Sequence, residues 1–99
     1  MMDETPIIEH ADGRLIVRGP VTLSHAQTLL DQSRPAFMGT DLRIDLSGVS
    51  EADSCAVALL LEWERRAVAR GASIRFENPT ANLRTLIGLY DVGELLPGM

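Results

Sequence analysis

The sequence predicts a single α/β (α+β) domain, residues 1–99, in which three to four helices pack against a mixed sheet of about four strands. Two observations lead to this prediction. A chain of 99 residues has the length of one domain, and its 45% of apolar residues is the average for a globular protein. Segments with the two-residue period of strands alternate with segments of helical period, in the order β-β-α-β-α-β-α. Such alternation is typical of a sheet, at least partly parallel, that is covered by helices.

The N-terminal segment predicts a β-hairpin. Residues 6–10 and 15–18 each have the length and apolar content of a short strand. Between them lies Asp12-Gly13, a dipeptide favoured in hairpin turns because glycine accepts the positive φ that the turn requires. Gly19-Pro20 is expected to end the pairing, since proline has no N–H to donate to a continued ladder.

A helix is expected next, because the apolar period changes from two to about 3.6 residues. Thr22 or Ser24 is placed to cap the first turn of this helix. The helix runs to about Ser33, and Pro35 ends it. Its apolar face consists of Leu23, Ala26, Leu29 and Leu30.

The centre of the chain predicts a strand, a loop and a long helix. Residues 42–46 alternate between apolar and polar, which indicates a half-buried strand, and residues 47–49 form its exit loop. Asp53 is a good N-cap for a helix over residues 54–70. Gly71 is a natural residue to end that helix, because glycine accepts the left-handed conformation that many helix ends adopt.

The C-terminal third predicts a strand over residues 72–77 and a helix over residues 81–89. Asn78-Pro79-Thr80 starts this last helix. Its apolar side chains, grouped on one face, are Leu83, Leu86, Ile87 and Tyr90. In the tail, three apolar residues are expected to pack back onto the sheet: Val92, Leu95 and Leu96.

Composition argues against nucleic acids and membranes as direct partners. The formal net charge is −5, and the one basic cluster, formed by Arg65, Arg66 and Arg70, is offset by nearby glutamates. No apolar run approaches the roughly 20 residues that span a bilayer. Cys55 is the single cysteine, which fits a reducing compartment, and the N-terminus has no signal-peptide character. A cytoplasmic location without direct membrane insertion is therefore expected.

The sequence offers no catalytic pair. His10 and His25 are far apart, and neither has a second metal ligand at the required spacing. Cys55 has no neighbouring histidine that would make it a thiolate, and no histidine can be assigned as a base for Ser54. No glycine-rich phosphate loop is present. We therefore expect no enzymatic activity, no cofactor and no metal site.

Ser54 has two interpretations. It helps Asp53 to satisfy the free N–H groups of a helix start, or it accepts a phosphate at that position. A phosphate there would be stabilised by the helix N-terminus, and would be repelled by Asp53 and Glu51.

The helix after Ser54 presents a face suited to protein docking. At 100° per residue, one side is mostly apolar: Val57, Leu60, Glu64, Ala67 and Val68. Leu61 and Trp63 lie at its edges, and Trp63 is assigned to the core rather than to an interface rim. Leu59, beside the outer side, is expected to be at least partly exposed. The outer side begins with small residues and ends with charged ones, a pattern that an ordinary solvated helix shares: Ser54, Cys55, Ala58, Glu62, Arg65, Arg66 and Ala69.

Two neighbouring motifs carry a family resemblance. Asp45-Leu46-Ser47-Gly48-Val49, followed by the segment 53–61 that begins Asp53-Ser54, resembles the STAS domain family. The order of elements also agrees over nearly the whole chain. The resemblance implies that Ser54 is the family's functional serine or threonine. Where the family usually has serine or glycine and then glycine, this chain has Cys55 and Ala56, which add bulk beside Ser54.

Within the family, the chain is most similar to the cytoplasmic STAS subunit of a phospholipid ABC transporter. The residues that carry this similarity are 58–61, 89–92 and 95–97. The similarity implies binding to the ATPase subunit, and thus a location peripheral to the inner membrane through that partner. The partner-binding residues would be Asp53, Ser54, Cys55, Ala58, Leu59, Glu62 and Arg65. The alternative is an anti-sigma-factor antagonist that an anti-sigma kinase switches by phosphorylating Ser54.

Overall fold

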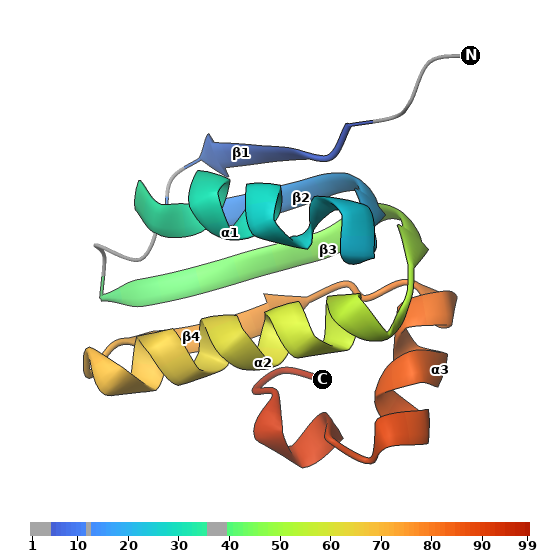
Figure 1. Cartoon of the computed structure of the whole chain (residues 1–99). Helices are drawn as coiled ribbons and strands as arrows, with labels where there is room; N and C mark the ends of the chain where they lie inside the picture. Colours follow the sequence, from blue (N-terminus) through green and yellow to red (C-terminus); the bar gives the residue numbers. More distant parts are fainter. Residues whose placement is uncertain (1–4, 12, 36–39) are drawn as a thin grey trace.

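A four-stranded mixed sheet forms the centre of the protein, as predicted (Figure 1). The computed structural model describes residues 5–11, 13–35 and 40–99. The strands lie in the order β1-β2-β3-β4. The first pair is antiparallel and the other two pairs are parallel. The strands are β1 (Ile7–Ala11), β2 (Arg14–Val21), β3 (Asp41–Ala52) and β4 (Ser73–Glu77).

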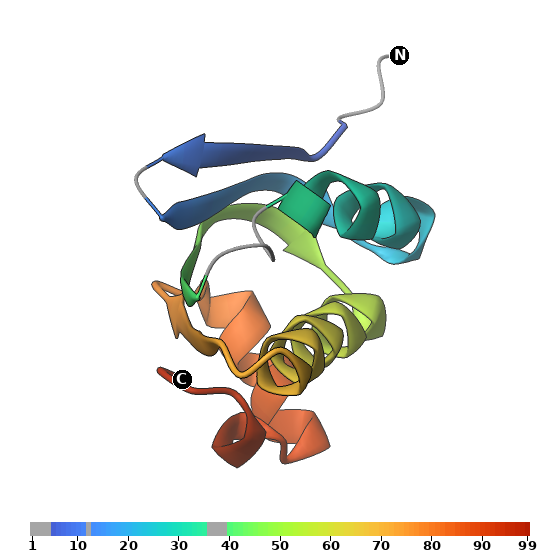
Figure 2. The same ribbon diagram turned by 90° about the vertical axis from the view of Figure 1, so that its left-hand side faces the viewer.

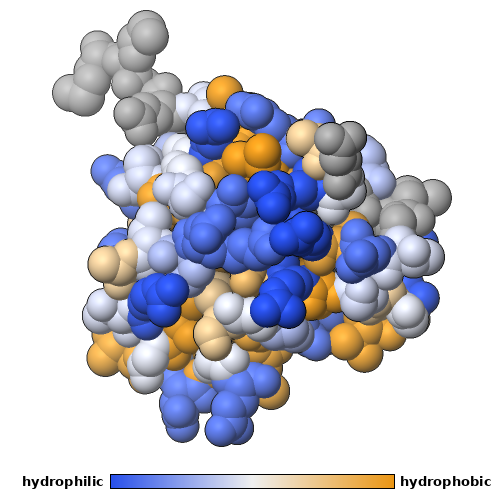
Figure 3. Space-filling view, turned by 180° about the vertical axis from the view of Figure 1, so that it is seen from behind, coloured by the Kyte–Doolittle hydropathy of each residue, from blue (hydrophilic) through white to orange (hydrophobic). Residues whose placement is uncertain are grey.

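Two of the helices cover one face of this sheet. Figures 1 and 2 show α1 and α2 on the same side, with α3 at the end of the sheet where α2 begins. Seen from behind, the opposite face gathers hydrophilic side chains (Figure 3). The helices are α1 (Ala26–Ser33), α2 (Ser54–Ala69) and α3 (Ala81–Tyr90), with short 3₁₀ helices η1 (Leu23–His25) and η3 (Gly93–Leu95).

The core lies between the sheet and the helices. Alternate residues of the strands point into it, among them Val17, Ile44 and Phe76, and their neighbours face solvent. Trp63 of α2 is fully buried, which confirms its assignment to the core. Its indole Nε1–H donates to Ser33 Oγ at 2.8 Å, so the one polar atom of this side chain is satisfied inside the core.

Two strands are longer than the sequence predicts. β2 continues through Gly19-Pro20 to Val21, and β3 continues through residues 47–49, which were expected to form a loop. The pairing of β1 with β2 ends at Arg18, and beyond it β2 pairs only with β3, with a register shift between Gly19 and Pro20. A proline is tolerated at such an irregularity because it is not required to donate to the ladder.

Four apolar residues that were expected to pack are exposed instead: Leu23, Val68, Tyr90 and Leu95. Leu23 lies in η1, ahead of α1. The N-cap residues of η1 and α1, Thr22 and His25, form no side-chain cap hydrogen bond. After Trp63, the buried part of α2 narrows to Ala67. In the tail, the next residue, Leu96, occupies the core in place of Leu95. Asp12 of the expected hairpin turn lies outside the described residues.

The Asp53 carboxylate joins two helical segments that are distant in the chain. Its Oδ1 accepts a hydrogen bond from the backbone N–H of Cys55 at 2.8 Å, as the predicted N-cap of α2. Its Oδ2 accepts from the backbone N–H of Leu23 at 3.1 Å. One side chain thus satisfies N–H groups at the start of α2 and at the start of η1, and it fixes where α2 begins.

Hydrogen bonds from outside the sheet reach both of its outer strands. The Ile8 N–H of β1 donates to Gln32 Oε1 of α1 at 3.3 Å. At the other edge, the Phe76 N–H of β4 donates to the carbonyl of Pro97 at 2.8 Å. Gly98 follows with φ +93°, and a Cβ there would overlap the Phe76 carbonyl oxygen. The tail therefore runs against β4 in a path that only glycine permits.

We predict that Asp53→Ala lowers the free energy of unfolding by about 1–2 kcal/mol, because two backbone N–H groups lose their acceptor. Asp53→Asn is expected to cost less, since its single amide oxygen still caps α2. Urea denaturation measures both. Asp31→Ala, at an exposed aspartate of α1, is the control and is expected to change stability by less than about 0.5 kcal/mol. Equal losses in the two alanine variants would contradict the role given to Asp53.

The buried Trp63–Ser33 pair gives a second prediction. Ser33→Ala is expected to lower the free energy of unfolding by about 1–3 kcal/mol, because it removes the acceptor of the indole N–H. The same substitution in a Trp63→Phe background is expected to cost less, since phenylalanine has no donor there. A double-mutant cycle by urea denaturation measures the difference. A coupling energy of zero would show that this hydrogen bond does not stabilise the fold.

Two glycines should respond oppositely to alanine. Gly98→Ala is expected to destabilise the protein by more than about 1 kcal/mol, because both its φ and the Phe76 carbonyl exclude a Cβ. Gly88→Ala is expected to stabilise it by about 0.5–1 kcal/mol, because a Cβ there meets nothing within 4 Å and alanine favours the helix. Thermal unfolding of both variants measures the signs, and a stabilising Gly98→Ala would refute the close approach of the tail.

Candidate protein-docking surface

The predicted docking surface begins at the first turn of α2. Asp53 has extended backbone angles and caps the helix, which then starts at Ser54. Ser54 and Ala58, four residues apart, are both exposed, so they lie on one face of the helix. Cys55 is half-buried beside them. The structure therefore brings these predicted residues together around the start of α2.

Leu59 was wrongly assigned to this surface. It is 3% exposed and belongs to the core. The assignment assumed that α2 is covered on one side only. In the structure α2 contacts α1 and η1 as well as α3, β3 and β4, so neighbours surround more of the helix than a single sheet would cover. The exposed face is correspondingly narrower.

The later part of the surface is an ion-pair cluster one to three turns further along α2. The Glu62 carboxylate accepts hydrogen bonds from Arg65 Nη2 at 2.6 Å and from Arg66 Nε at 2.9 Å. The hydrogen bond from Arg66, followed by that from Arg65, lowers the pKa of Glu62 below the usual glutamate value. Arg65 remains largely exposed. Such exposed pairs contribute little to stability, so these charges are available to orient a partner.

A surface hollow of about 250 Å³ opens next to Ser54. Its lining is mainly apolar and comes from two parts of the chain: Ser54, Val57, Ala58, Leu61, Tyr90 and Val92. Sequence reasoning did not assign Tyr90 and Val92 to the site. They lie 21 and 23 residues after the end of α2 and reach it only through the packing of α3 on α2. No local pattern signals such a contact, although both residues lie in a segment that carries the family resemblance.

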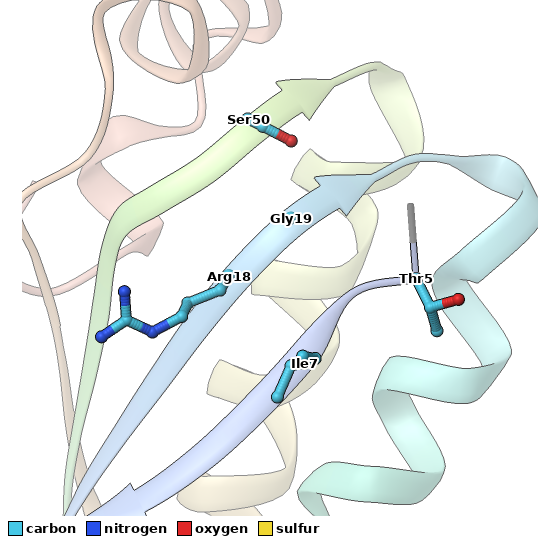
Figure 4. Close-up of a pocket in the computed structure, with 5 residues that line it drawn as sticks. All are labelled: Thr5, Ile7, Arg18, Gly19 and Ser50. Carbon is cyan, nitrogen blue, oxygen red and sulfur yellow. The ribbon is translucent and has the colours of Figure 1, made fainter. Parts of the chain in front are cut away.

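A second hollow, of about 360 Å³, lies near the opposite, hydrophilic face of the sheet. Figure 4 shows the five residues that line it, which come from β1, β2, β3 and the residue Thr5. The one charged side chain among them, Arg18, pairs with Glu9 at 2.8 Å. None of the predicted site residues lies here.

Neither histidine adds chemistry to the docking surface. His10 is exposed on β1, and His25 is half-buried at the end of η1. Within residues 5–11, 13–35 and 40–99, no group of three or more His, Cys, Asp or Glu side chains could hold a metal ion. Over the same residues, none of the helices has both the length and the apolar character needed to cross a membrane. The surface around Ser54 thus combines a small-residue helix start, an apolar hollow and a charged end.

Comparison with solved structures places this fold among known ones. The chain is similar to the anti-sigma factor antagonist SpoIIAA in its unphosphorylated form, with a TM-score of 0.72 and 17% identity over 96% of this chain and 88% of that one. The phosphorylated form of the Bacillus cell fate determinant SpoIIAA gives 0.68 and 17% over 96% and 91%. SLC26A9 gives 0.71 and 16%, over 83% of this chain but only 16% of that much longer one. At these identities the similarity establishes the fold.

The sequence comparison is more specific. No curated protein matches the chain. A family model described as "Mlab, STAS domain" matches residues 7–97. This match covers all four strands and all three α-helices. The chain therefore belongs to the STAS domain family.

Proposed function

We propose that this protein is a non-enzymatic regulatory or assembly subunit that binds the ATPase subunit of an ABC transporter. The transporter would move phospholipid between the two membranes of a Gram-negative envelope and so maintain the lipid asymmetry of the outer membrane. The observation that carries the proposal is the match of the model described as "Mlab, STAS domain" over residues 7–97. It agrees with the resemblance of residues 58–61, 89–92 and 95–97 to the STAS subunit of such a transporter. The protein would lie in the cytoplasm, peripheral to the inner membrane through its partner.

The docking surface at the start of α2 supports a static protein contact. Small exposed side chains at Ser54 and Ala58 allow another backbone to approach closely. The adjacent hollow offers a place for a buried anchor, and Glu62 and Arg65 supply charges at the rim. Protein interfaces commonly combine a desolvated centre with such a polar rim.

Within this proposal Asp53 positions the surface. Both of its carboxylate oxygens already accept backbone hydrogen bonds, from Cys55 and from Leu23. A partner that bound Asp53 directly would have to compete with these bonds. We therefore assign direct contact to Ser54, Cys55, Ala58, Glu62 and Arg65.

A second function, an anti-sigma-factor antagonist switched by phosphorylation, is favoured by the exposure of Ser54. Its hydroxyl lies at the N-terminus of a 16-residue helix, where free N–H groups stabilise an added phosphate. The presence of Cys55 and Ala56 beside it weighs against this alternative, because their bulk restricts the approach of a kinase active site.

Affinity purification of the tagged protein from its native cell, with mass spectrometry of its partners and of Ser54, separates the two functions. The transporter proposal predicts an ABC ATPase at stoichiometric yield and an unmodified Ser54. A kinase partner together with phosphate on Ser54 would replace it with the antagonist function.

Substitutions on the exposed face of α2 test the surface itself. Ala58→Arg and Ser54→Glu are expected to lower the affinity for the captured ATPase at least about tenfold, because each places a long charged side chain where a partner must approach. Ala69→Arg is the matched control. Ala69 is an exposed alanine eleven residues, or about three turns, further along nearly the same face.

All three variants should keep the circular dichroism spectrum and the melting temperature of the parent protein, since the substituted residues are exposed. Unchanged affinity in folded Ala58→Arg and Ser54→Glu proteins would place the interface elsewhere.

A further inference from the structure

The hollow beside Ser54 has a volume that suits a side chain of another protein. Its volume of about 250 Å³ is below the range of roughly 300–1,000 Å³ that is typical of sites for small-molecule ligands. Four of its six lining residues are hydrophobic side chains larger than alanine: Val57, Leu61, Tyr90 and Val92. One or two apolar side chains of another protein would fill such a space.

Exposed apolar residues stand close in the chain to the residues that line the hollow. Leu89 is 75% exposed, Tyr90 is 52% exposed and Leu95 is 58% exposed. All three come from the end of α3 and the segment that follows it, the same part of the chain that supplies Tyr90 and Val92 to the hollow. Exposed large apolar side chains are thus concentrated in the segment of the chain that also supplies part of the lining.

The residues that flank the lining in the chain are acidic. Asp53 directly precedes Ser54, and Asp91 stands between Tyr90 and Val92. Glu51 and Glu94, two or three residues further out on each side, are exposed as Asp91 is. These four carboxylates therefore stand within three residues of a lining residue in the chain, in a protein whose net charge is −5.

Among the arginines, Arg65 is the nearest in the chain to a lining residue. Arg65 lies one turn beyond Leu61 on α2, and its guanidinium is paired with Glu62 at 2.6 Å. The charged residues next to the lining residues in the chain are thus acidic, and the nearest arginine is ion-paired. A partner that matches this pattern carries cations beside its apolar side chain.

We propose that the hollow receives an apolar side chain from a partner protein, and that lysine or arginine residues flank this side chain in the partner. The inference rests on the proposed function, since it concerns the same docking surface, and it adds the chemistry by which the partner is recognised. The buried apolar anchor supplies most of the affinity, and the charges supply orientation and speed of association.

Small probes test this inference without the partner. Phenethylammonium and 3-phenylpropionate carry the same phenyl group and opposite charges. Each is titrated into the ¹⁵N-labelled protein at low ionic strength, and amide shifts are followed by NMR. The cation is expected to shift the amides of Ser54, Ala58, Leu61 and Tyr90, and to bind about twofold to fivefold more tightly than the anion. Salt at 0.5 M should remove the difference, because it screens exposed charges.

Variants separate the two parts of the inference. Ala58→Leu fills the hollow and is expected to abolish the shifts, whereas Ala69→Leu, three turns away, leaves them unchanged. Asp91→Asn combined with Glu94→Gln should keep binding and reduce the preference for the cation. Asparagine suits position 91, where φ is +54°.

Three results would overturn the inference: amide shifts confined to residues away from the hollow, no amide shifts at probe concentrations up to about 50 mM, or equal affinity for the cation and the anion. Its failure is distinguishable from that of the proposed function. Capture of an ABC ATPase does not depend on these probes, and the probes do not depend on the identity of the partner.

Discussion

The hydrogen bonds of Asp53 are the constraint on which the functional surface depends. One carboxylate caps α2 and holds the start of η1, so the first turn of the long helix and the entry to α1 are fixed to each other. Ser54 follows Asp53 directly in the chain, so the hydrogen bonds of Asp53 also fix the position of Ser54. The serine to which we assign contact with a partner is thus placed by its neighbour in the chain, which serves the fold.

The core determines how much of α2 is left for a partner. Sheet, α1 and α3 all contact this helix, and Trp63, its largest side chain, is buried with its N–H bonded to Ser33. What remains exposed is a narrow strip that begins with small side chains at Ser54 and Ala58. Specificity then has to come from what borders the strip, namely the apolar hollow on one side and the Glu62 ion pairs at its end.

Local patterns predicted most of the fold. The start of α2 at Ser54 and its end before Gly71, which has φ +72°, follow from a capping aspartate and a glycine that tolerates the left-handed conformation. The mixed sheet follows from the alternation of elements. The lengths of β2 and β3 did not follow from local patterns. The bulge that accommodates Pro20 in β2 depends on the pairing of β2 with β3.

For the site, too, features set by the local sequence were predicted and features set by residues distant in the chain were not. Ser54 and Ala58 were predicted from helical spacing. Leu59 was misplaced, because its burial depends on neighbours that are distant in the chain. For the same reason Tyr90 and Val92 were missed, since only the packing of α3 against α2 brings them to Ser54.

The contacts on the two outer strands limit the ways in which another protein can attach. An N–H of β1 is already bonded to Gln32, and an N–H of β4 is bonded to the carbonyl of Pro97. Strand addition at either edge, a common mode of peptide recognition and of aggregation, would first have to displace a helix side chain or peel away the tail. Attachment through a helix surface requires neither. These hydrogen bonds thus make strand addition at the outer strands less favourable than docking on the helix surface.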